Sequence, residues 1–314
     1  MENIKQEKDY ETFKEIINGL SKQQKTLPSK LFYDERGSKL FDEICELEEY
    51  YPTRTELKIM EDNIDEIASV FSDETLFIEF GSGSSLKTRL LLRHLDKLAG
   101  YIPIDISKEH LHNSANQLNE EFPDLNIYPV AADYTKSFVL PSIAGEVKHK
   151  IAYYPGSTIG NFTAKGAKMF LKQIAGLVGK EGGLIIGVDL IKDKDVLHAA
   201  YNDSEGITAE FNLNILNRLN NDFCFNFDTD KFLHKAIFNE YENRIEMHLV
   251  CKENQKISSN GNSFEIMKGE TILTEYSHKY SFDSFQEIAS EYFTVDKIWT
   301  DEKEYFSIQF LTAN

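Results

Sequence analysis

The stretch Glu79-Phe-Gly-Ser-Gly-Ser-Ser-Leu-Lys-Thr-Arg89 determines the fold, because the apolar run from Thr75 to Phe80 ends there at a Gly-x-Gly turn. An amphipathic pattern from Leu86 to Leu95 follows, so the stretch predicts a strand, a tight turn and a helix. Gly81 and Gly83 allow a sharp turn and the close approach of a ligand, and the first N–H groups of the helix face that ligand. The sequence therefore predicts a small polar ligand at this turn.

The next predicted strand indicates which kind of ligand binds at this turn. A Gly-x-Gly turn alone is weak support for a nucleotide, and Leu86 replaces the last glycine of the dinucleotide fingerprint, which disfavours NAD. The run Tyr101 to Ile106 contains Asp105, about twenty residues after the turn, where a neighbouring parallel strand presents a carboxylate to ribose hydroxyls. Asp105 can alternatively cap the helix that begins near Ser107, but its pairing with the turn favours the ribose role.

Composition limits the partners. The chain has 314 residues, 41% hydrophobic and 27% charged, which suffices for one large or two modest soluble domains. Its formal charge of -18 repels phosphate backbones and anionic lipids, so we expect neither nucleic-acid nor membrane partners. A small zwitterion is the more suitable substrate.

The cysteines and the polar start of the chain indicate a reducing compartment. Cys45, Cys224 and Cys251 are far apart and lack metal-site spacing, so we expect buried reduced thiols and no structural zinc. No signal-peptide core and no run of spanning length is visible, and we expect a cytoplasmic protein.

Alternating strands and helices continue after Asp105. The pattern predicts helices and strands at Ser107–Phe122 (helix), Asn126–Val130 (strand), Lys148–Tyr154 (strand), Thr163–Leu177 (helix) and Leu184–Leu190 (strand). Asp133 follows the third strand and is placed to bind an adenine amine, with Tyr134 covering the base. Asn161, in the glycine-rich loop after the fourth strand, can both donate and accept where ligands of such sheets bind.

Outside this region the alternation breaks. We expect helices at 9–21, from Gly37 to Pro52, at 55–71 and at 284–289, a mostly helical segment at 198–220, and strands at 234–238, 244–252, 263–266, 294–300 and 305–312. The last two strands resemble a final hairpin of the main sheet. The predicted domains are therefore 54–191 with 281–314, and a discontinuous second domain of 1–53 with 192–280.

Six blocks of sequence carry a family resemblance. They are Phe32-Tyr-Asp-Glu-Arg-Gly-Ser38, Glu49-Tyr-Tyr-Pro-Thr-Arg-Thr-Glu56, Gly81-Ser-Gly-Ser-Ser-Leu-Lys-Thr-Arg89, Pro155-Gly-Ser-Thr-Ile-Gly-Asn161, Ala200-Tyr-Asn-Asp203 and Thr274-Glu-Tyr-Ser277. In this order they resemble the L-histidine Nα-methyltransferases of ergothioneine biosynthesis over nearly the whole chain. The resemblance implies an α/β fold: a Rossmann-like class I S-adenosylmethionine-dependent methyltransferase domain with a discontinuous α+β substrate-binding domain. It also implies trimethylation of the α-amine of histidine to hercynine.

The resemblance also implies the site residues. For the cofactor these are Gly81, Ser82, Gly83, Lys87, Asp105, Asp133 and Tyr134, and for catalysis Tyr33, Gly156 and Asn161. Histidine would be bound by Tyr50, Asn161, Tyr201, Met247, Glu275 and Ser277. In the family, Asn161 and Tyr201 would hold the α-carboxylate, Glu275 and Ser277 the imidazole, and Tyr33 the surroundings of the amine, while Tyr50 would reach the imidazole, directly or through water. The resemblance assigns no role to Arg36 or Tyr276.

The chemistry suits these residue types. Methyl transfer from a sulfonium needs an unprotonated amine, correct positioning and exclusion of water, and aromatic rings tolerate a growing methylated cation. No metal is expected, and His248 and His278 are interpreted as surface or second-domain residues. We expect a monomer. The alternatives are a methyltransferase of the same fold for another amino acid or amine, and a cofactor-binding regulatory protein with a structural glycine loop.

Overall fold

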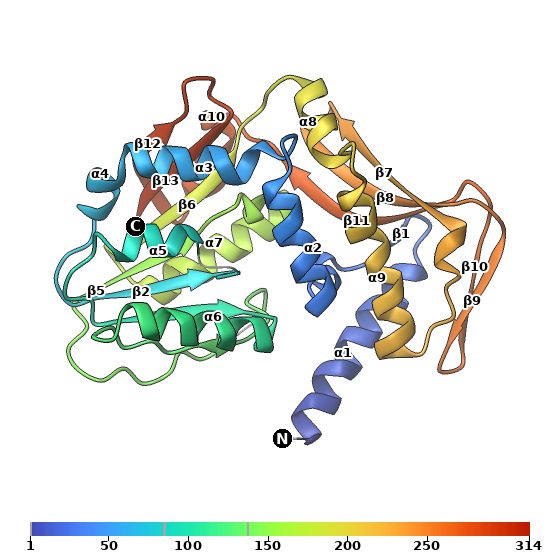
Figure 1. Ribbon diagram of the computed structural model, residues 1–314, viewed down its shortest axis with the longest axis horizontal. Helices are drawn as coiled ribbons and strands as arrows, with labels where there is room; N and C mark the ends of the chain where they lie inside the picture. Colours follow the sequence, from blue (N-terminus) through green and yellow to red (C-terminus); the bar gives the residue numbers. More distant parts are fainter. Residues whose placement is uncertain (1, 84–85, 137) are drawn as a thin grey trace. The chain divides into compact units, whose positions relative to one another are not determined.

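The chain divides into two compact units. The computed structural model describes residues 2–83, 86–136 and 138–314 (Figure 1). Residues up to Tyr50 and Asp193–Ser277 form one unit, here called the insert unit, and Tyr51–Lys192 with His278–Asn314 form the other, the sheet unit. The expected boundaries at 54, 191 and 281 correspond to 51, 192 and 278 in the structure. That the two units are separate cofactor-binding and substrate-binding domains stays a prediction.

The sheet unit is built on one mixed sheet. Among the described residues its strand order is β12-β13-β6-β5-β2-β3-β4, with all neighbours parallel except β13, which is antiparallel to β6 and β12. The strands are β2 (Thr75–Phe80), β3 (Gly100–Asp105), β4 (Val130–Ala131), β5 (His149–Tyr154), β6 (Gly183–Asp189), β12 (Phe293–Thr300) and β13 (Phe306–Ala313). The doubly wound sheet and its terminal hairpin are confirmed. The third strand is shorter than expected, since only an isolated bridge at Ile127 precedes Val130.

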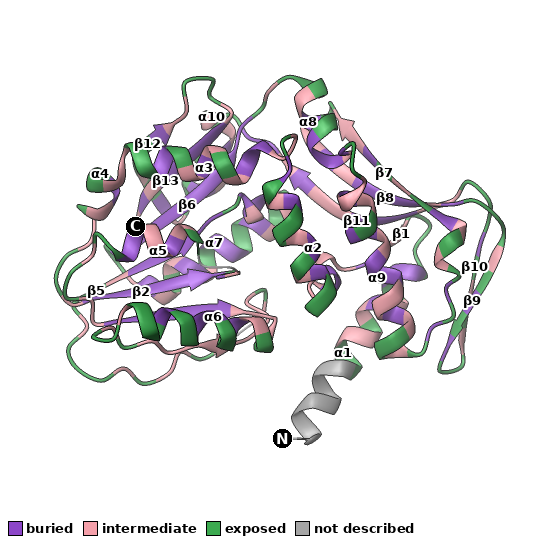
Figure 2. Cartoon of the chain, in the orientation of Figure 1, coloured by how far each residue is buried: buried purple, intermediate pink, exposed green. Residues whose placement is uncertain are grey.

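Helices cover both faces of this sheet. They are α3 (Tyr51–Asp62), α4 (Ile64–Ala68), α5 (Leu86–Leu92), α6 (Lys108–Glu121), α7 (Ala164–Val178) and α10 (Phe282–Ala289). Leu76 and Ile78 of β2 pack with α7 and α10, whereas Phe77 packs with α3, α4, α5 and α6. Because successive strand residues point to opposite faces, burial of β2 on both sides explains why its sequence is apolar apart from Thr75 and Glu79 (Figure 2).

Two expected helix boundaries are wrong. Gly37 does not start the helix but lies inside α2 (Glu35–Glu46), where its N–H donates to the capping carboxylate of Asp34 at 2.7 Å. Pro52 does not end a helix either, because it lies in the first turn of α3, where a missing N–H leaves no hydrogen bond unmade. One helix was expected at 55–71, but the chain forms α3 and the short α4.

The insert unit contains helices and a small sheet. Its elements are α1 (Glu2–Leu20), β1 (Lys25–Thr26), η1 (Ser29–Phe32), α2, α8 (Lys194–Tyr201), α9 (Ile207–Phe223), η3 (Thr229–Lys231), β7 (Phe232–Asn239), β8 (Arg244–Cys251), β9 (Gln255–Ser259), β10 (Asn262–Ile266) and β11 (Thr271–His278). The sheet order is β1-β11-β8-β7, and β9 pairs with β10 separately. The strand β9 was not expected, although Asn260 and Gly261, both with positive φ, form the two-residue hairpin turn typical of Asn-Gly.

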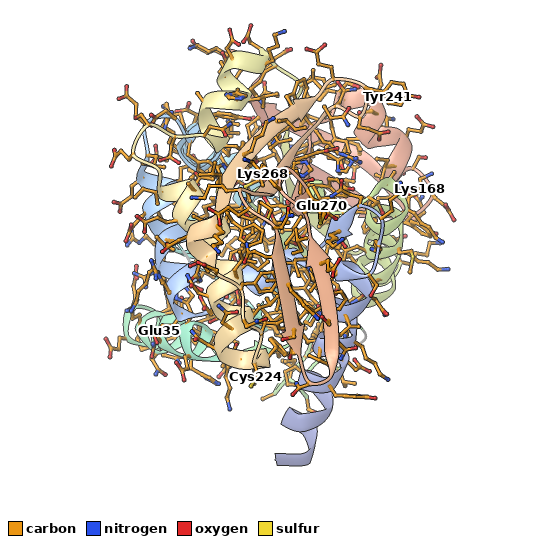
Figure 3. The ribbon with its side chains drawn as sticks, turned by 90° about the vertical axis from the view of Figure 1, so that its right-hand side faces the viewer. Glu35, Lys168, Cys224, Tyr241, Lys268 and Glu270 are labelled. Atoms are coloured by element: carbon orange, nitrogen blue, oxygen red, sulfur yellow. The ribbon has the colours of Figure 1, made fainter. Side chains whose placement is uncertain are left out.

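The cysteines depart from the expectation of buried thiols. All three are free, but Cys251 is buried, Cys45 is half-buried and Cys224 is exposed. Cys224 follows α9 in a left-handed conformation, φ 54°, which places it at the surface (Figure 3). None of the described helices has an apolar stretch long enough to span a membrane.

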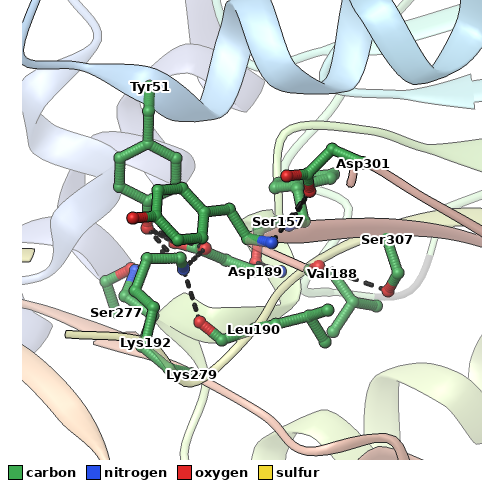
Figure 4. Close-up of polar contacts among 12 residues, drawn as sticks. Tyr51, Ser157, Val188, Asp189, Leu190, Lys192, Ser277, Lys279, Asp301 and Ser307 are labelled. Carbon is green, nitrogen blue, oxygen red and sulfur yellow. Dashed lines mark hydrogen bonds and ion pairs between the residues drawn. The ribbon is translucent and has the colours of Figure 1, made fainter. Parts of the chain in front are cut away.

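A buried charge cluster lies at the end of β6 (Figure 4). The carboxylate of Asp189, 1% exposed, accepts hydrogen bonds from the Tyr51 hydroxyl at 2.8 Å and from Lys279 Nζ at 2.6 Å, and it also pairs with Lys192. Burial acts to raise the pKa of Asp189, but the two lysines outweigh it and hold that pKa below its ordinary value. The chain passes from one unit to the other after residues 50, 192 and 277. Each of these three connections has one partner of Asp189 at or within two residues of it: Tyr51, Lys192 and Lys279 in turn. One carboxylate therefore anchors the ends of three connections.

Replacing this carboxylate should destabilise the protein strongly. Asp189→Asn leaves two buried ammonium groups without a counter-charge, and we expect a loss of about 3–5 kcal/mol in the free energy of unfolding at pH 7. Because burial lowers the pKa of Lys192 to about 8, the loss should shrink at pH 9, where this lysine can be neutral. Urea unfolding measures both values.

The matched control is Asp62→Asn, which removes an exposed carboxylate paired with Lys58 one helical turn away. Its cost should stay below about 1 kcal/mol. Equal costs for the two variants would show that Asp189 is not a structural anchor.

Candidate functional site

The glycine turn after β2 has the backbone geometry that the sequence predicted. Gly81 and Gly83 have φ of 73° and 44°, and the Gly81 N–H donates to the Ile104 carbonyl at 2.8 Å. A Cβ on Gly81 would lie 3.8 Å from the Tyr134 hydroxyl, which is ordinary contact distance. Ser82 between them is buried. Ser84 and Ser85 of the same stretch lie outside the described residues.

Asp105 at the end of β3 lies beside this turn. Its carboxylate accepts hydrogen bonds from the Ser107 N–H at 2.8 Å and from the Gly83 N–H at 3.3 Å. The N-cap of α6 is Ser107, so Asp105 is not the capping residue that the alternative interpretation supposed. Burial raises the pKa of Asp105. The carboxylate is thus fixed against the turn, and its role toward a ribose stays a prediction.

Two further cofactor candidates follow β4. Tyr134 packs its ring against Phe80, Tyr154 and Phe170, with ring centroids 5.7, 5.9 and 5.6 Å away, and burial raises its pKa. The structure therefore brings Tyr134 next to Gly81. Asp133, half-buried, accepts a hydrogen bond from the Thr135 N–H at 3.1 Å.

Glu79 is a buried acid beneath the turn that was not singled out from the sequence. It is 1% exposed and accepts hydrogen bonds from the Thr88 hydroxyl at 2.6 Å and from the Tyr101 hydroxyl. Burial raises the pKa of Glu79 to about 7. An acid inside a strand that is otherwise apolar was the signal that could have identified it.

The glycine-rich loop after β5 is fixed along its length. Gly156 has φ of 75°, and the left-handed Ser157, φ 54°, accepts a hydrogen bond from the Asp189 N–H at 2.8 Å. A Cβ on Gly160 would lie 2.8 Å from the His278 carbonyl, and His278 Nδ1 is 2.8 Å from the Gly160 carbonyl. Asn161 ends the short helix η2 (Thr158–Asn161).

His278 therefore differs from its expected place. It is half-buried in the sheet unit rather than a surface or second-domain residue, because the backbone of His278 packs directly on Gly160.

Within the insert unit, the candidate substrate residues gather in an aromatic cluster. Phe41 lies between Tyr33 and Tyr50, with ring centroids 5.8 and 6.3 Å away, and Tyr50 is 6.3 Å from Tyr201. The Tyr201 hydroxyl is 2.7 Å from Ser277 Oγ, and both residues are buried. Phe41 was not singled out from the sequence.

Glu275 and Met247 belong to the same part of the insert unit. The pKa of Tyr50 is raised first by burial and then by Tyr201, Cys45, Tyr33 and Glu275, so the half-buried Glu275 lies within electrostatic reach of Tyr50. Met247 is buried in β8, and its carbonyl accepts from the Thr274 hydroxyl at 3.0 Å.

The two residues without an assigned role lie in other contacts. The Arg244 guanidinium stacks 3.8 Å above the Tyr276 ring, and Arg36 forms an exposed ion pair with Glu210.

The backbone of Tyr201 is fixed by polar residues that were not expected from the sequence. His234 Nε2 is 2.8 Å from the Tyr201 carbonyl, and its Nδ1 is 2.8 Å from Asn212 Nδ2. Asn212 also donates to the His248 carbonyl, which fixes Nδ2 as the donor, so His234 accepts at Nδ1 and donates at Nε2. Burial lowers the pKa of His234, which favours this neutral form.

Of the predicted site residues, the structure brings together two sets. Gly81, Ser82, Gly83, Asp105 and Tyr134 surround the glycine turn, and Lys87 of α5 lies near Gly156, with its Nζ 3.7 Å from the position of a Gly156 Cβ. The second set is Tyr33, Tyr50, Tyr201, Glu275 and Ser277. Within the described parts of the chain, no group of His, Cys, Asp and Glu side chains has the arrangement of a metal site.

A sheet of this strand order with a glycine turn after β2 is the Rossmann-like fold of class I S-adenosylmethionine-dependent methyltransferases. Comparison with known sequences identifies the class more closely. The chain belongs to the family of histidine-specific, S-adenosylmethionine-dependent methyltransferases, whose sequence profile matches residues 12–313.

Individual relatives agree with this membership. The chain is 36% identical to the histidine N-alpha-methyltransferases of Mycobacterium tuberculosis and of Mycolicibacterium smegmatis, each match covering 94% of this chain and 92% of the relative. A solved S-adenosylmethionine-dependent methyltransferase from Clostridium acetobutylicum superposes with a TM-score of 0.46 at 10% identity, covering 81% of this chain and 91% of that one. With a TM-score below 0.5, this likeness supports no conclusion about the family or the substrate.

The buried acid beneath the turn makes stability depend on pH. The pKa of Glu79 is about 7 when folded against 4.5 ordinarily, so its stabilising contribution is complete below about pH 4.5 and is lost as the pH rises through 7. In Glu79→Gln the new amide resembles the protonated acid and cannot ionise. We therefore expect the stability of Glu79→Gln relative to the parent protein to rise by about 2.5 kcal/mol between pH 5 and pH 8.

Urea unfolding at several pH values measures this difference. Glu109→Gln, at an exposed glutamate of α6, should show no such trend. A difference that stays constant with pH for Glu79→Gln would contradict the assigned pKa.

Proposed function

We propose that this protein transfers three methyl groups from S-adenosylmethionine to the α-amine of L-histidine, giving hercynine and S-adenosylhomocysteine. This is the first step of ergothioneine biosynthesis. Membership of the histidine-specific family supports the proposal. The observation that carries it is the pair of buried hydroxyls on Tyr201 and Ser277, 2.7 Å apart beside aromatic rings, with Glu275 two residues from Ser277. In the proposal, Ser277 and Glu275 give this aromatic setting a polar edge for the imidazole, and the neighbouring Tyr201 hydroxyl binds the α-carboxylate.

The residues around the glycine turn fit S-adenosylmethionine. Positive φ at Gly81 and Gly83 opens the backbone to a ligand, and a side chain on Gly81 would project toward the Tyr134 hydroxyl, into the space we assign to the cofactor. In the proposal Asp105 binds the ribose and Asp133 the adenine amine, with Tyr134 beside the base. Gly81, Ser82, Gly83 and Lys87 complete the cofactor site.

The proposed histidine site uses residues that donate and accept. Asn161 and Tyr201 hold the α-carboxylate, and Glu275 and Ser277 read the imidazole, which Tyr50 also reaches. Tyr33 and Gly156 border the amine, and Met247 supports the site from β8. A carboxylate accepts from an imidazole N–H, and a hydroxyl donates or accepts as the tautomer requires.

The reaction is a displacement at the sulfonium methyl group. The lone pair of the unprotonated amine nitrogen forms a bond to the methyl carbon. At the same time the carbon–sulfur bond breaks, and the electron pair of that bond goes to sulfur. The amine must lose a proton before each of the three transfers, and the last product is a quaternary ammonium ion. Aromatic faces such as that of Tyr33 can meet this cation. The proposed reaction uses no metal, nucleic acid, membrane or second subunit, and we propose a cytoplasmic monomer.

The imidazole assignment can be tested by substitution. In a strand, residues two apart share a face, so Glu275→Leu with Ser277→Ala removes both proposed imidazole partners at once. Because a site built on hydrogen bonds rejects side chains that cannot return them, the parent protein should trimethylate histidine and hardly methylate phenylalanine. The double variant should lose this preference by roughly a hundredfold or more. Mass spectrometry of the products measures the preference.

The control is Glu265→Leu with Ser263→Ala, an exposed pair with the same spacing on β10. This variant should keep the preference for histidine. A parent protein that binds S-adenosylhomocysteine yet leaves histidine unmethylated would favour another amino acid or amine as the acceptor.

A further inference from the structure

Glu56 is a fully buried carboxylate in the middle of α3 that the proposed site does not use. Its solvent exposure is 0%. Both of its oxygens accept from the Gly156 N–H, at 2.9 and 3.1 Å, and Oε2 forms an ion pair with Lys87 Nζ. One side chain thus contacts a candidate cofactor residue and a candidate catalytic residue.

The fold provides a space for this carboxylate. A Cβ on Gly187 of β6 would lie 2.3 Å from Glu56 Oε1, so only glycine at that position lets the side chain reach the sheet. Tyr51, Pro52, Ile59 and Met60 form the rest of the buried face of α3. The apolar face of α3 thus carries one glutamate, and Gly187 of the central strand β6 leaves the room that its side chain fills.

The energetics make the three groups interdependent. A buried carboxylate is costly unless it is paired and hydrogen-bonded, and Lys87 supplies the charge while Gly156 supplies a backbone donor. The position of the lysine head therefore depends on Glu56, since Lys87 itself is only 16% exposed. The backbone position of Gly156, at the start of the loop that leads to Asn161, depends on Glu56 as well.

We propose that Glu56 is a positioning residue that couples the cofactor lysine Lys87 to the substrate loop at Gly156. The inference rests on the proposed function for the roles of Lys87 and Gly156. Glu56 itself contacts neither substrate nor cofactor, and it acts by fixing the groups that do. Disturbing it should change cofactor affinity and histidine KM together.

The test is Glu56→Gln, which keeps the shape of the side chain but replaces one acceptor oxygen with a donor facing Lys87 or Gly156. We expect S-adenosylhomocysteine binding, measured by calorimetry, to weaken roughly tenfold to a hundredfold, and the KM for histidine at saturating S-adenosylmethionine to rise by a similar factor. If Glu56 acted only through its charge, Glu56→Gln should instead bind S-adenosylhomocysteine more tightly. The freed charge of Lys87 would then attract the carboxylate of S-adenosylhomocysteine more strongly. Unchanged or tighter S-adenosylhomocysteine binding overturns the proposal.

A double-substitution cycle separates coupling from general damage. If Glu56 acts through Lys87, adding Lys87→Met to Glu56→Gln should weaken S-adenosylhomocysteine binding by less than the product of the two single effects. Independent, multiplying effects would contradict the coupling. Should Glu56→Gln not fold, Glu56→Asp keeps the buried charge but shortens its reach, and it should weaken binding in the same direction.

The control is Glu66→Gln on α4, a glutamate that accepts from the Trp299 indole N–H at 3.1 Å. It should leave the affinity for S-adenosylhomocysteine and the KM for histidine unchanged. The calorimetric measurement needs no histidine, so it can support the coupling even if histidine is not the acceptor. Normal binding and normal KM in Glu56→Gln, in a preparation whose parent protein methylates histidine, would overturn this inference alone.

Discussion

A buried carboxylate between two buried lysines is the constraint on which much of the sheet unit depends. Asp189 ends β6, and its side chain joins Tyr51, Lys192 and Lys279 (Figure 4). Its backbone N–H donates to Ser157 in the loop that contains Gly156 and Asn161. The same residue therefore anchors three chain connections and the loop proposed to carry catalytic groups. Breaking such a pair costs more than the pair contributes, since an uncompensated buried charge remains.

A second set of acids surrounds the glycine turn. Glu56 pairs with Lys87, Glu79 is held by Thr88 and Tyr101, and Asp105 accepts from Gly83. Glu79 is sensitive to both Lys87 and Asp105, which lower and raise its pKa respectively. Of these acids, Glu56 is compensated by Lys87, and burial raises the pKa of Glu79 to about 7. Each acid also holds neighbouring residues in place through its hydrogen bonds or ion pair. The geometry of the proposed binding site and the stability of the turn therefore depend on the same residues.

The sequence was sufficient for the features that depend on local pattern. The apolar run before Gly81, the two glycines and the alternation of strands and helices placed the sheet, its turn and its final hairpin correctly. The errors came where neighbouring residues competed for one helix boundary: Asp34 caps a helix that continues through Gly37, and Pro52 starts a helix instead of ending one. The strand β9 was missed because its polar residues show little strand pattern before Asn260 and Gly261 reverse the chain.

Buried polar residues could not be predicted in the same way. Glu56 contacts Gly156, and Asn212 contacts Thr274, across long separations in the sequence. No spacing rule relates such partners, because the fold alone brings them together. The family resemblance supplied the candidate residues Tyr33, Tyr201, Glu275 and Ser277, whereas the structure supplied their neighbours Phe41 and His234.

The assignment of the two ligand sites can be examined directly with a crystal structure of the protein bound to S-adenosylhomocysteine and L-histidine. We expect the adenosine at Asp105, Asp133 and Tyr134, and the imidazole within hydrogen-bond distance of Glu275 and Ser277. The Glu56 carboxylate should keep its contact with the Gly156 N–H. An imidazole bound away from Glu275 and Ser277, or adenosine away from the glycine turn, would contradict the assignment.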